Sequence, residues 1–193
     1  MKRLCVFCGS NVGLAGKYIP AAQEVGTLIA QRGYELVYGG AQIGLMGAVA
    51  DAALLAGGRV IGVIPDALAR KEVAHADLSE LHVVKTMHER KALMAELADG
   101  FLALPGGCGT FDELFEIVTW AQIGIHRKPC AVLNVCGYFD PLIALFEHAI
   151  EEQFVPRQHA ALLLNDSSAE RLLDRMEQYI PPDVPKWLDL EAL

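Results

Sequence analysis

The strongest constraint on the fold is the regular alternation of short apolar runs with longer amphipathic stretches along the 193 residues. This alternation predicts repeated β-α units, because each strand of a parallel sheet is followed by a helix that covers it. The expected strands are 3–8, 35–38, 59–64, 81–84, 100–104, 130–135 and 161–164. The expected helices are 17–32, 44–56, 86–98, 110–123, 139–152 and 168–179. The chain therefore reads as an α/β protein with a Rossmann-like, doubly wound parallel sheet flanked by helices.

Composition agrees with a sheet that is covered on both faces. Hydrophobic residues make up 53% of the chain, which is rich for a protein whose strands are not buried on both sides. The length suits one domain, which we expect to span residues 1–180. Residues 181–193 contain three prolines and Trp187, and we expect this tail to pack along the surface.

The charge balance excludes some classes of partner. A net charge of −8 disfavours a surface that neutralises a nucleic-acid backbone, which requires clustered Lys and Arg. The first apolar stretch, Leu4–Cys8, is too short for a signal segment or a membrane span. We therefore expect a cytoplasmic protein that binds neither nucleic acid nor membrane.

The five cysteines do not indicate a disulfide framework, and an odd number fits reduced thiols. Cys5 and Cys8 have Cys-x-x-Cys spacing but lie in a strand, where positions three apart point to opposite faces. A second pair, which a zinc site of this kind would need, does not accompany them. We expect them to be buried small residues and expect no metal site.

Glycine-rich loops follow three of the expected strands, at the sheet edge where doubly wound folds bind ligands. Glycine lets backbone N–H groups approach an anion closely, and the helix that follows adds its positive end. One such loop could be a simple turn, but three at strand ends favour an anion site. Neither G-x-G-x-x-G nor G-x-x-x-x-G-K-[ST] occurs, which disfavours dinucleotides and nucleoside triphosphates. The loop residues are Gly9 and Ser10; Gly39, Gly40, Gly44 and Met46; and Gly106, Gly107, Cys108, Gly109 and Thr110.

A basic pair lies at the start of the fourth expected helix. Thr86 and Glu89 have capping-box spacing, which predicts a helix that begins near Met87. Arg90 and Lys91 then fall in or near the first turn, where a cation opposes the helix dipole by about 0.3 to 1 kcal/mol. Two adjacent cations there suggest a compensating phosphate or ribose. The alternative is a solvated basic pair on the helix surface.

Glu113 has two interpretations from spacing alone. Thr110 and Glu113 also match a capping box, in which the carboxylate would only bind the helix terminus. Glu113 also follows a candidate phosphate loop, where a group that activates water or stabilises a cation would be useful. Asp112 and Glu116 are neighbouring acids, and spacing does not choose among the three.

Two long motifs carry a family resemblance. Residues 105–113 fit PGGxGTxxE and residues 39–47 fit GGxxxGLMG. Both resemble the "lonely guy" (LOG) family, the cytokinin riboside 5′-monophosphate phosphoribohydrolases, whose members are often labelled lysine decarboxylases. The resemblance extends from Cys5 to about Asn165 and includes residues 87–91 and 119–122.

The resemblance implies roles for individual residues. Arg90 and Glu113 match the family's catalytic pair, whereas Lys91, Thr119 and the loop 107–110 match residues that hold the nucleotide. Glu72 corresponds to a glutamate of the family's lid segment. Cys108 departs from the tyrosine that is frequent at this position. The substrate-binding residues we expect are Gly9, Ser10, Gly39, Gly40, Gly44, Met46, Glu72, Met87, Lys91, Gly106, Gly107, Cys108, Gly109, Thr110 and Thr119.

The resemblance implies a hydrolase that cleaves the N-glycosidic bond of a nucleoside 5′-monophosphate, yielding free base and ribose 5-phosphate without a metal or organic cofactor. It also implies a homodimer or higher homo-oligomer. Two alternatives remain: a carrier that binds a nucleotide or the molybdenum cofactor without turnover, and a broad nucleotide nucleosidase. Lysine decarboxylation is disfavoured, because a pyridoxal-phosphate enzyme needs a Schiff-base lysine in a pocket and usually has a far longer chain.

Overall fold

The computed structural model of the protein describes residues 1–69 and 74–182. Its centre is a seven-stranded sheet in which every neighbouring pair of strands is parallel. The strands are β1 (Arg3–Phe7), β2 (Glu35–Tyr38), β3 (Val60–Pro65), β4 (Glu80–Val84), β5 (Gly100–Ala103), β6 (Cys130–Leu133) and β7 (Leu163–Asp166). Their order, β4-β3-β2-β1-β5-β6-β7, confirms the predicted doubly wound parallel sheet.

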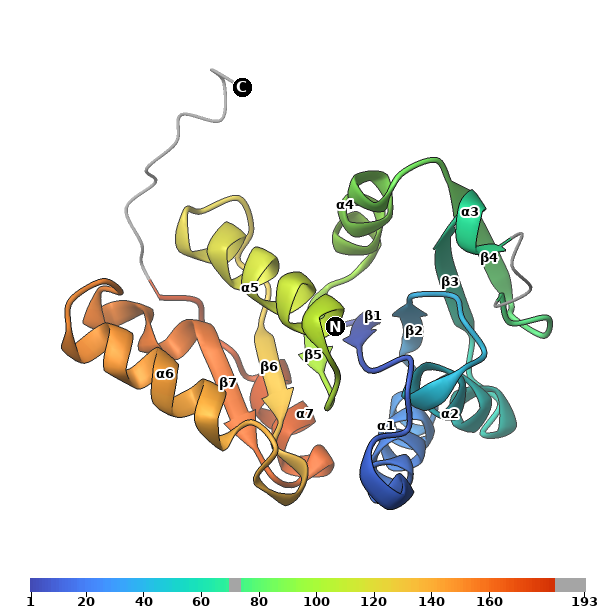
Figure 1. The fold of residues 1–193 in the computed structure, drawn as a ribbon, viewed down its shortest axis with the longest axis horizontal. Coiled ribbons are helices and arrows are strands. Elements are labelled where there is room, and N and C mark those ends of the chain that lie inside the picture. The colour runs from blue at the N-terminus through green and yellow to red at the C-terminus, as the bar shows by residue number, and fades with distance from the viewer. Residues whose placement is uncertain (70–73, 183–193) are drawn as a thin grey trace.

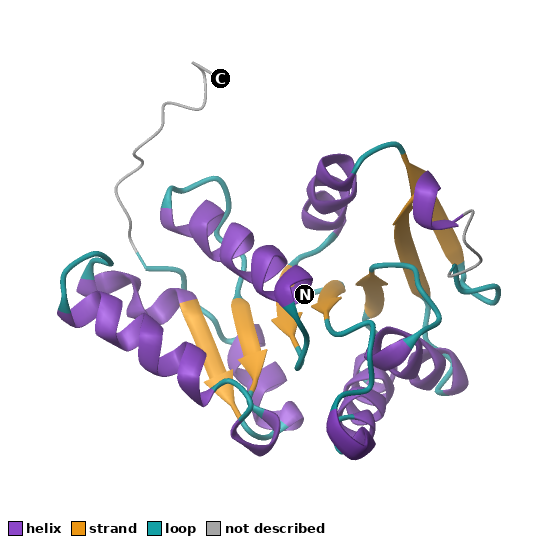
Figure 2. Cartoon of the chain, in the orientation of Figure 1, coloured by secondary structure: helices purple, strands orange, loops and turns teal. Residues whose placement is uncertain are grey.

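Helices cover both faces of the sheet (Figures 1 and 2). Apolar residues of α1, α2 and α7 pack with one face, and those of α4, α5 and α6 pack with the other. The helices are α1 (Ile19–Gln31), α2 (Gly44–Leu55), α3 (Asp66–Leu68), α4 (Met87–Leu97), α5 (Cys108–Gln122), α6 (Asp140–Glu151) and α7 (Ala169–Glu177). None of the helices in the described part of the chain combines the length and the apolar character needed to cross a bilayer.

The continuous apolar runs of the sequence become strands buried on both faces. Every residue of β3, β5 and β6 is buried, as expected when helices cover both sides of a parallel sheet. Cys5 and Cys8 are buried free cysteines, which confirms their interpretation as small core residues. At Gly26, a Cβ would overlap the carbonyl oxygen of Val49, so glycine allows α1 and α2 to pack closely.

The strand order locates the ligand-binding crevice. From β1 the chain winds through β2 and β3 to β4 at one edge, and then returns to place β5 on the other side of β1. Connections leaving β1 and β5 therefore diverge, and a crevice opens between them at the carboxyl end of the sheet. Gly9 N–H donates to the Pro105 carbonyl over 3.0 Å, which joins the two loops at this point.

Several predicted boundaries are wrong by a few residues. Helix α5 begins at Cys108 rather than at residue 110, because Gly107 takes the N-cap position. Strand β7 is shifted two residues beyond its expected range, since residues 157–162 form a 3-10 helix. The expected loop 66–80 begins with the short helix α3. Of the expected tail 181–193, only the first two residues are among those described.

Candidate active site

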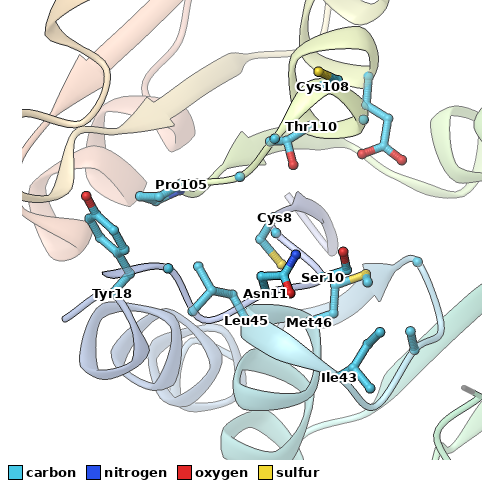
Figure 3. A pocket seen from close by; sticks show the side chains of 18 of the residues that line it. Cys8, Ser10, Asn11, Tyr18, Ile43, Leu45, Met46, Pro105, Cys108 and Thr110 are labelled. Atoms are coloured by element: carbon cyan, nitrogen blue, oxygen red, sulfur yellow. The ribbon is translucent and has the colours of Figure 1, made fainter. Parts of the chain in front are cut away.

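A cavity of about 630 Å³ opens at the carboxyl ends of the central strands. Figure 3 shows its two walls: Pro105, Cys108 and Thr110 project from one, and Ser10, Leu45 and Met46 project from the other. Both walls come from glycine-rich loops that the sequence identified. Of the predicted site residues, the cavity is lined by Gly9, Ser10, Gly39, Met46, Arg90, residues 106–110 and Glu113.

The amino-terminal end of α5 forms one side of the cavity. The first amides of an α-helix have no acceptor within the helix, and the N-cap Gly107 has no side chain to cap them. Apart from the adjacent residues and the backbone of α5 itself, no described atom lies within 4 Å of the position that a Cβ would take at Gly107 or Gly109. A Cβ at Gly106 would instead overlap Thr110 Oγ1. The helix end is therefore accessible, and its dipole and amides suit an anion.

Arg90 enters the cavity from α4. This helix begins at Met87, as predicted, and the hydroxyl of Thr86 accepts the Glu89 N–H over 3.1 Å. The Arg90 Nε donates to the Val63 carbonyl over 3.1 Å, so the backbone of β3 fixes the guanidinium. Its Nη1 lies 3.3 Å from Glu113 Oε1, and the two side chains are only 12% and 10% exposed. Arg90 is thus not a solvated surface cation.

Glu113 is not a capping residue in this structure. Because α5 begins at Cys108, Glu113 lies in the second turn, beyond reach of the N-cap. Burial raises the pKa of its carboxyl group, and the nearby charge of Arg90 offsets only part of that rise. The carboxylate is therefore a stronger base than an ordinary glutamate, and it faces the cavity.

Lys91 lies behind the cavity lining. Its Nζ is 3.1 Å from Asp112 Oδ2 and 3.1 Å from Glu116 Oε1. Burial lowers the pKa of Lys91, but the hydrogen bonds to the two carboxylates outweigh that effect and raise it. Asp112 and Glu116 are thus engaged with Lys91, and of the three neighbouring acids only Glu113 lines the cavity.

The second glycine loop shapes the site through close packing. A Cβ at Gly39 would overlap Arg90 Nη2, so only glycine leaves room for the guanidinium there. Gly44 has a φ of +63°, and a Cβ there would overlap the Ser10 backbone of the first loop. The Gly40 carbonyl accepts the His75 N–H over 2.9 Å. Gly40 and Gly44 thus support the loop and lie outside the cavity lining.

Three further predicted residues lie away from the lining. Met87 is exposed, and its sulfur accepts a hydrogen bond from Arg90 Nη1 over 3.3 Å. Thr119 is an exposed residue farther along α5 than Glu113. Glu72 lies outside the described residues. The binding roles of these residues, like that of Lys91, stay predictions.

Two tyrosines that the sequence reasoning missed also line the cavity. The rings of Tyr18 and Tyr138 meet edge to face, with centroids 5.5 Å apart. Tyr138 follows β6, so the rule that ligands bind beyond strand ends could have found it. Tyr18 precedes α1 and carries no comparable sequence signal. The other overlooked lining residues include the polar Asn11, which follows Ser10, and the apolar Ile43, Leu45, Ile64 and Leu68 (Figure 3).

The side chains at the cavity limit which cofactors could bind there. No lysine occurs among the described residues that line it, and Lys91 is held by two carboxylates outside it. These residues do not fit pyridoxal phosphate, which requires a lysine free to form a Schiff base. Within residues 1–69 and 74–182, no group of three His, Cys, Asp or Glu could hold a metal ion.

The sequence matches known proteins along most of its length. Residues 46–176 match the family described as "Possible lysine decarboxylase". The probable cytokinin riboside 5′-monophosphate phosphoribohydrolase LOGL1 of Oryza sativa subsp. japonica is 49% identical, over 92% of this chain and 79% of that protein. The chain belongs to the LOG family. A second LOG family member, the phosphoribohydrolase LOG1 of Arabidopsis thaliana, is 46% identical over 93% of this chain and 84% of its own length.

Solved structures share the LOG family fold at lower sequence identity. The molybdenum cofactor carrier protein of Chlamydomonas reinhardtii superposes with a TM-score of 0.71 at 20% identity, over 92% of this chain and 96% of that one. The molybdenum cofactor binding protein of Rippkaea orientalis gives 0.68 at 20% identity, over 92% and 97%. At this identity the likeness establishes the architecture alone.

Proposed function

We propose that this LOG family protein hydrolyses the N-glycosidic bond of a nucleoside 5′-monophosphate, releasing the base and ribose 5-phosphate. The observation that carries the proposal is the buried Arg90–Glu113 pair, with Nη1 and Oε1 3.3 Å apart, in the same cavity as the open end of α5. An anion site alone would suit a carrier. A carboxylate whose pKa burial raises, beside that anion site, suits catalysis of proton transfer.

The substrate binds through its phosphate. The 5′-phosphate accepts hydrogen bonds from the amides at the start of α5, where the helix dipole also favours a negative charge. Glu113 follows Thr110 on the same helix by about one turn, so its carboxylate faces the sugar that the phosphate carries. Binding energy from the phosphate, which does not react, orients the ribose for the chemical step.

In the chemical step, the bond between C1′ and the base nitrogen breaks and its electrons leave with the base. The ribose ring gains oxocarbenium character, as in glycoside cleavage. Glu113 takes a proton from the water that attacks C1′, whose hydroxyl forms the new bond to C1′. The nitrogen of the departing base takes a proton from solvent, and Glu113 returns its own proton to solvent, so the carboxylate is regenerated. Arg90 is too basic to donate a proton at neutral pH, so it positions the sugar and Glu113 electrostatically.

Apolar side chains offer a place for the base. Ile43, Met46, Ile64 and Leu68 line the cavity with Arg90, and Met46 approaches Gly39 next to the guanidinium. Such a lining favours a base with an apolar substituent, in keeping with the cytokinin nucleotides in the relatives' names.

The test is to incubate the purified protein with AMP and with isopentenyladenosine 5′-monophosphate and to separate the products by chromatography. We expect free base and ribose 5-phosphate, and we expect adenosine, which lacks the phosphate, to react far more slowly. Absence of product from every 5′-monophosphate would refute the proposal, and tight binding of unreacted molybdopterin would favour a carrier. The ratio of kcat/KM for the two nucleotides distinguishes a cytokinin-directed enzyme from a broad nucleosidase.

We further propose that the protein is a cytoplasmic homodimer or higher homo-oligomer. Exposed apolar side chains on and after α6, Leu145 and Phe154, support an interface on that side of the fold. Sedimentation at micromolar concentration should give a mass above that of one chain, and a monomer would contradict the proposal.

A further inference from the structure

Tyr138 lines the cavity and also binds the backbone of the anion loop. Its hydroxyl donates to the carbonyl oxygen of Gly106. The structure contains no cis peptide bond among its described residues, so the Gly106 C=O and the Gly107 N–H point in opposite directions. Because the Gly106 carbonyl points toward the Tyr138 hydroxyl, the Gly107 N–H points away from Tyr138.

A peptide between two glycines needs such a restraint. Glycine has no Cβ, so rotation of the peptide plane between Gly106 and Gly107 meets little steric resistance from either residue. Gly106 is held on one side, since it packs closely against Thr110 and the Gly9 nitrogen. Gly107 faces open space. The Gly107 carbonyl accepts the Phe111 N–H over 3.1 Å, but that bond restrains the next peptide. Among the described residues, the hydrogen bond from the Tyr138 hydroxyl to the Gly106 carbonyl is the one that restrains the peptide between Gly106 and Gly107.

Tyr138 is itself held firmly by the turn that follows β6. Asn134 Oδ1 accepts the Phe139 N–H over 2.8 Å, and Asn134 Nδ2 donates to Asp140 Oδ1 over 2.6 Å. The Tyr138 N–H donates to the Val135 carbonyl over 3.0 Å. Its ring packs edge to face against Phe139, with centroids 5.1 Å apart. A side chain restrained at both ends can hold a neighbouring peptide in one orientation.

We infer that Tyr138 is a positioning residue for phosphate recognition: it orients the Gly106–Gly107 peptide so that the Gly107 amide faces the 5′-phosphate of the substrate. The inference rests on the proposed function. Tyr138 acts through the loop and does not reach the Arg90–Glu113 pair through any hydrogen bond in the described chain. Loss of its hydroxyl should therefore weaken ground-state binding more than the chemical step.

The experiment compares Tyr138→Phe with the control Tyr34→Phe. Both variants lose one tyrosine hydroxyl that donates a hydrogen bond, but Tyr34 donates to Glu177, away from the cavity. Calorimetric titration with inorganic phosphate and with AMP measures binding, and steady-state kinetics give KM and kcat. For Tyr138→Phe we expect both dissociation constants and KM to rise about 10-fold, as loss of one well-made hydrogen bond allows. We expect kcat to change less than about 3-fold, and the control to match the wild type.

Two results would overturn the inference: unchanged binding of phosphate and AMP by Tyr138→Phe, or a fall in kcat with KM unchanged. A lower melting temperature with normal binding would also overturn it, because the hydroxyl would then only stabilise the fold. If the wild type binds phosphate and AMP but cleaves nothing, the proposed function fails, and the binding comparison still decides the role of Tyr138. If the wild type binds neither, both proposals fail.

Discussion

Replacement of Glu113 by glutamine separates catalysis from stability. Glutamine keeps the size of the side chain and an oxygen that can accept a hydrogen bond from Arg90, but it cannot take a proton from water. The structure removes the capping alternative, because α5 begins at Cys108 and Glu113 lies in its second turn. The change should therefore affect the reaction without loosening the helix terminus.

The rate should fall by at least about 100-fold if Glu113 transfers the proton, which corresponds to about 2.7 kcal/mol of transition-state stabilisation. In the wild type, activity should be lost as the pH falls through the pKa of Glu113. Burial raises that pKa above the ordinary value of 4.5, so the acid limb of kcat/KM should lie above pH 4.5. Glu113→Gln should lack this limb in its residual activity.

The pH dependence of folding stability should run opposite to that of activity. Because the folded-state pKa of Glu113 is raised, folding favours the protonated form, and this stabilisation is complete below the unfolded-state pKa. It is lost as the pH rises through the folded-state pKa. At neutral pH the buried, charged carboxylate makes the folded state less stable than a neutral side chain would. The Glu113→Gln variant should therefore unfold at the same temperature as the wild type or at a higher one.

The assay combines product analysis with thermal unfolding at pH 4 and pH 7. The rate loss should accompany an unchanged or higher melting temperature at pH 7, and any advantage over the wild type should disappear at pH 4. An active but less stable Glu113→Gln would refute the reasoning, because that is the behaviour of a capping residue. Asp112→Asn is a matched control, since this neighbouring acid binds Lys91 outside the cavity lining.

Further predictions concern the glycines around the site. Gly39→Ala should displace the Arg90 guanidinium, whose Nη2 occupies the space of the new Cβ, and should lower kcat/KM at least about 10-fold with little change in melting temperature. A normal rate would contradict the placement of Arg90. Gly106→Ala should destabilise the fold by about 1 to 3 kcal/mol in denaturant titration, because its Cβ would overlap Thr110. Gly107→Ala, whose Cβ meets open space, should keep the wild-type stability but bind phosphate about 10-fold more weakly in calorimetry, as its methyl group occupies the anion site.

The alternation of apolar runs and amphipathic stretches predicted the architecture because strands buried on both faces can be recognised directly in the sequence. A strand that is covered on both faces appears in the sequence as an unbroken apolar run, as residues 100–103 do, and α5 follows this strand as an amphipathic stretch. The position of the site followed from the same pattern, since glycine loops after β1 and β5 must meet at the switch point. Boundaries were less predictable where packing decided them, as at the shifted start of β7.

The two tyrosines that line the cavity were harder to predict from the sequence. Tyr18 and Tyr138 are separated by most of the chain, and only the folded sheet brings their rings to 5.5 Å. The residues around Tyr138 in the sequence do not indicate that its hydroxyl donates to the Gly106 carbonyl. Contacts of this kind depend on the relative position of β6 and β5, which periodicity does not specify.

The role of Glu113 shows why a local pattern can support two interpretations until tertiary contacts choose between them. Thr110 and Glu113 match a capping box, and that reading requires Thr110 to be the N-cap. The helix instead begins at Cys108 with Gly107 as its N-cap, and this places Glu113 in the second turn. There its carboxylate meets Arg90, which reaches it from a different helix. The N-cap thus lies three residues earlier than a capping box would require, and Glu113 becomes a buried base instead of a terminal cap. The residues that decide its role, Arg90 and Glu113, lie on different helices.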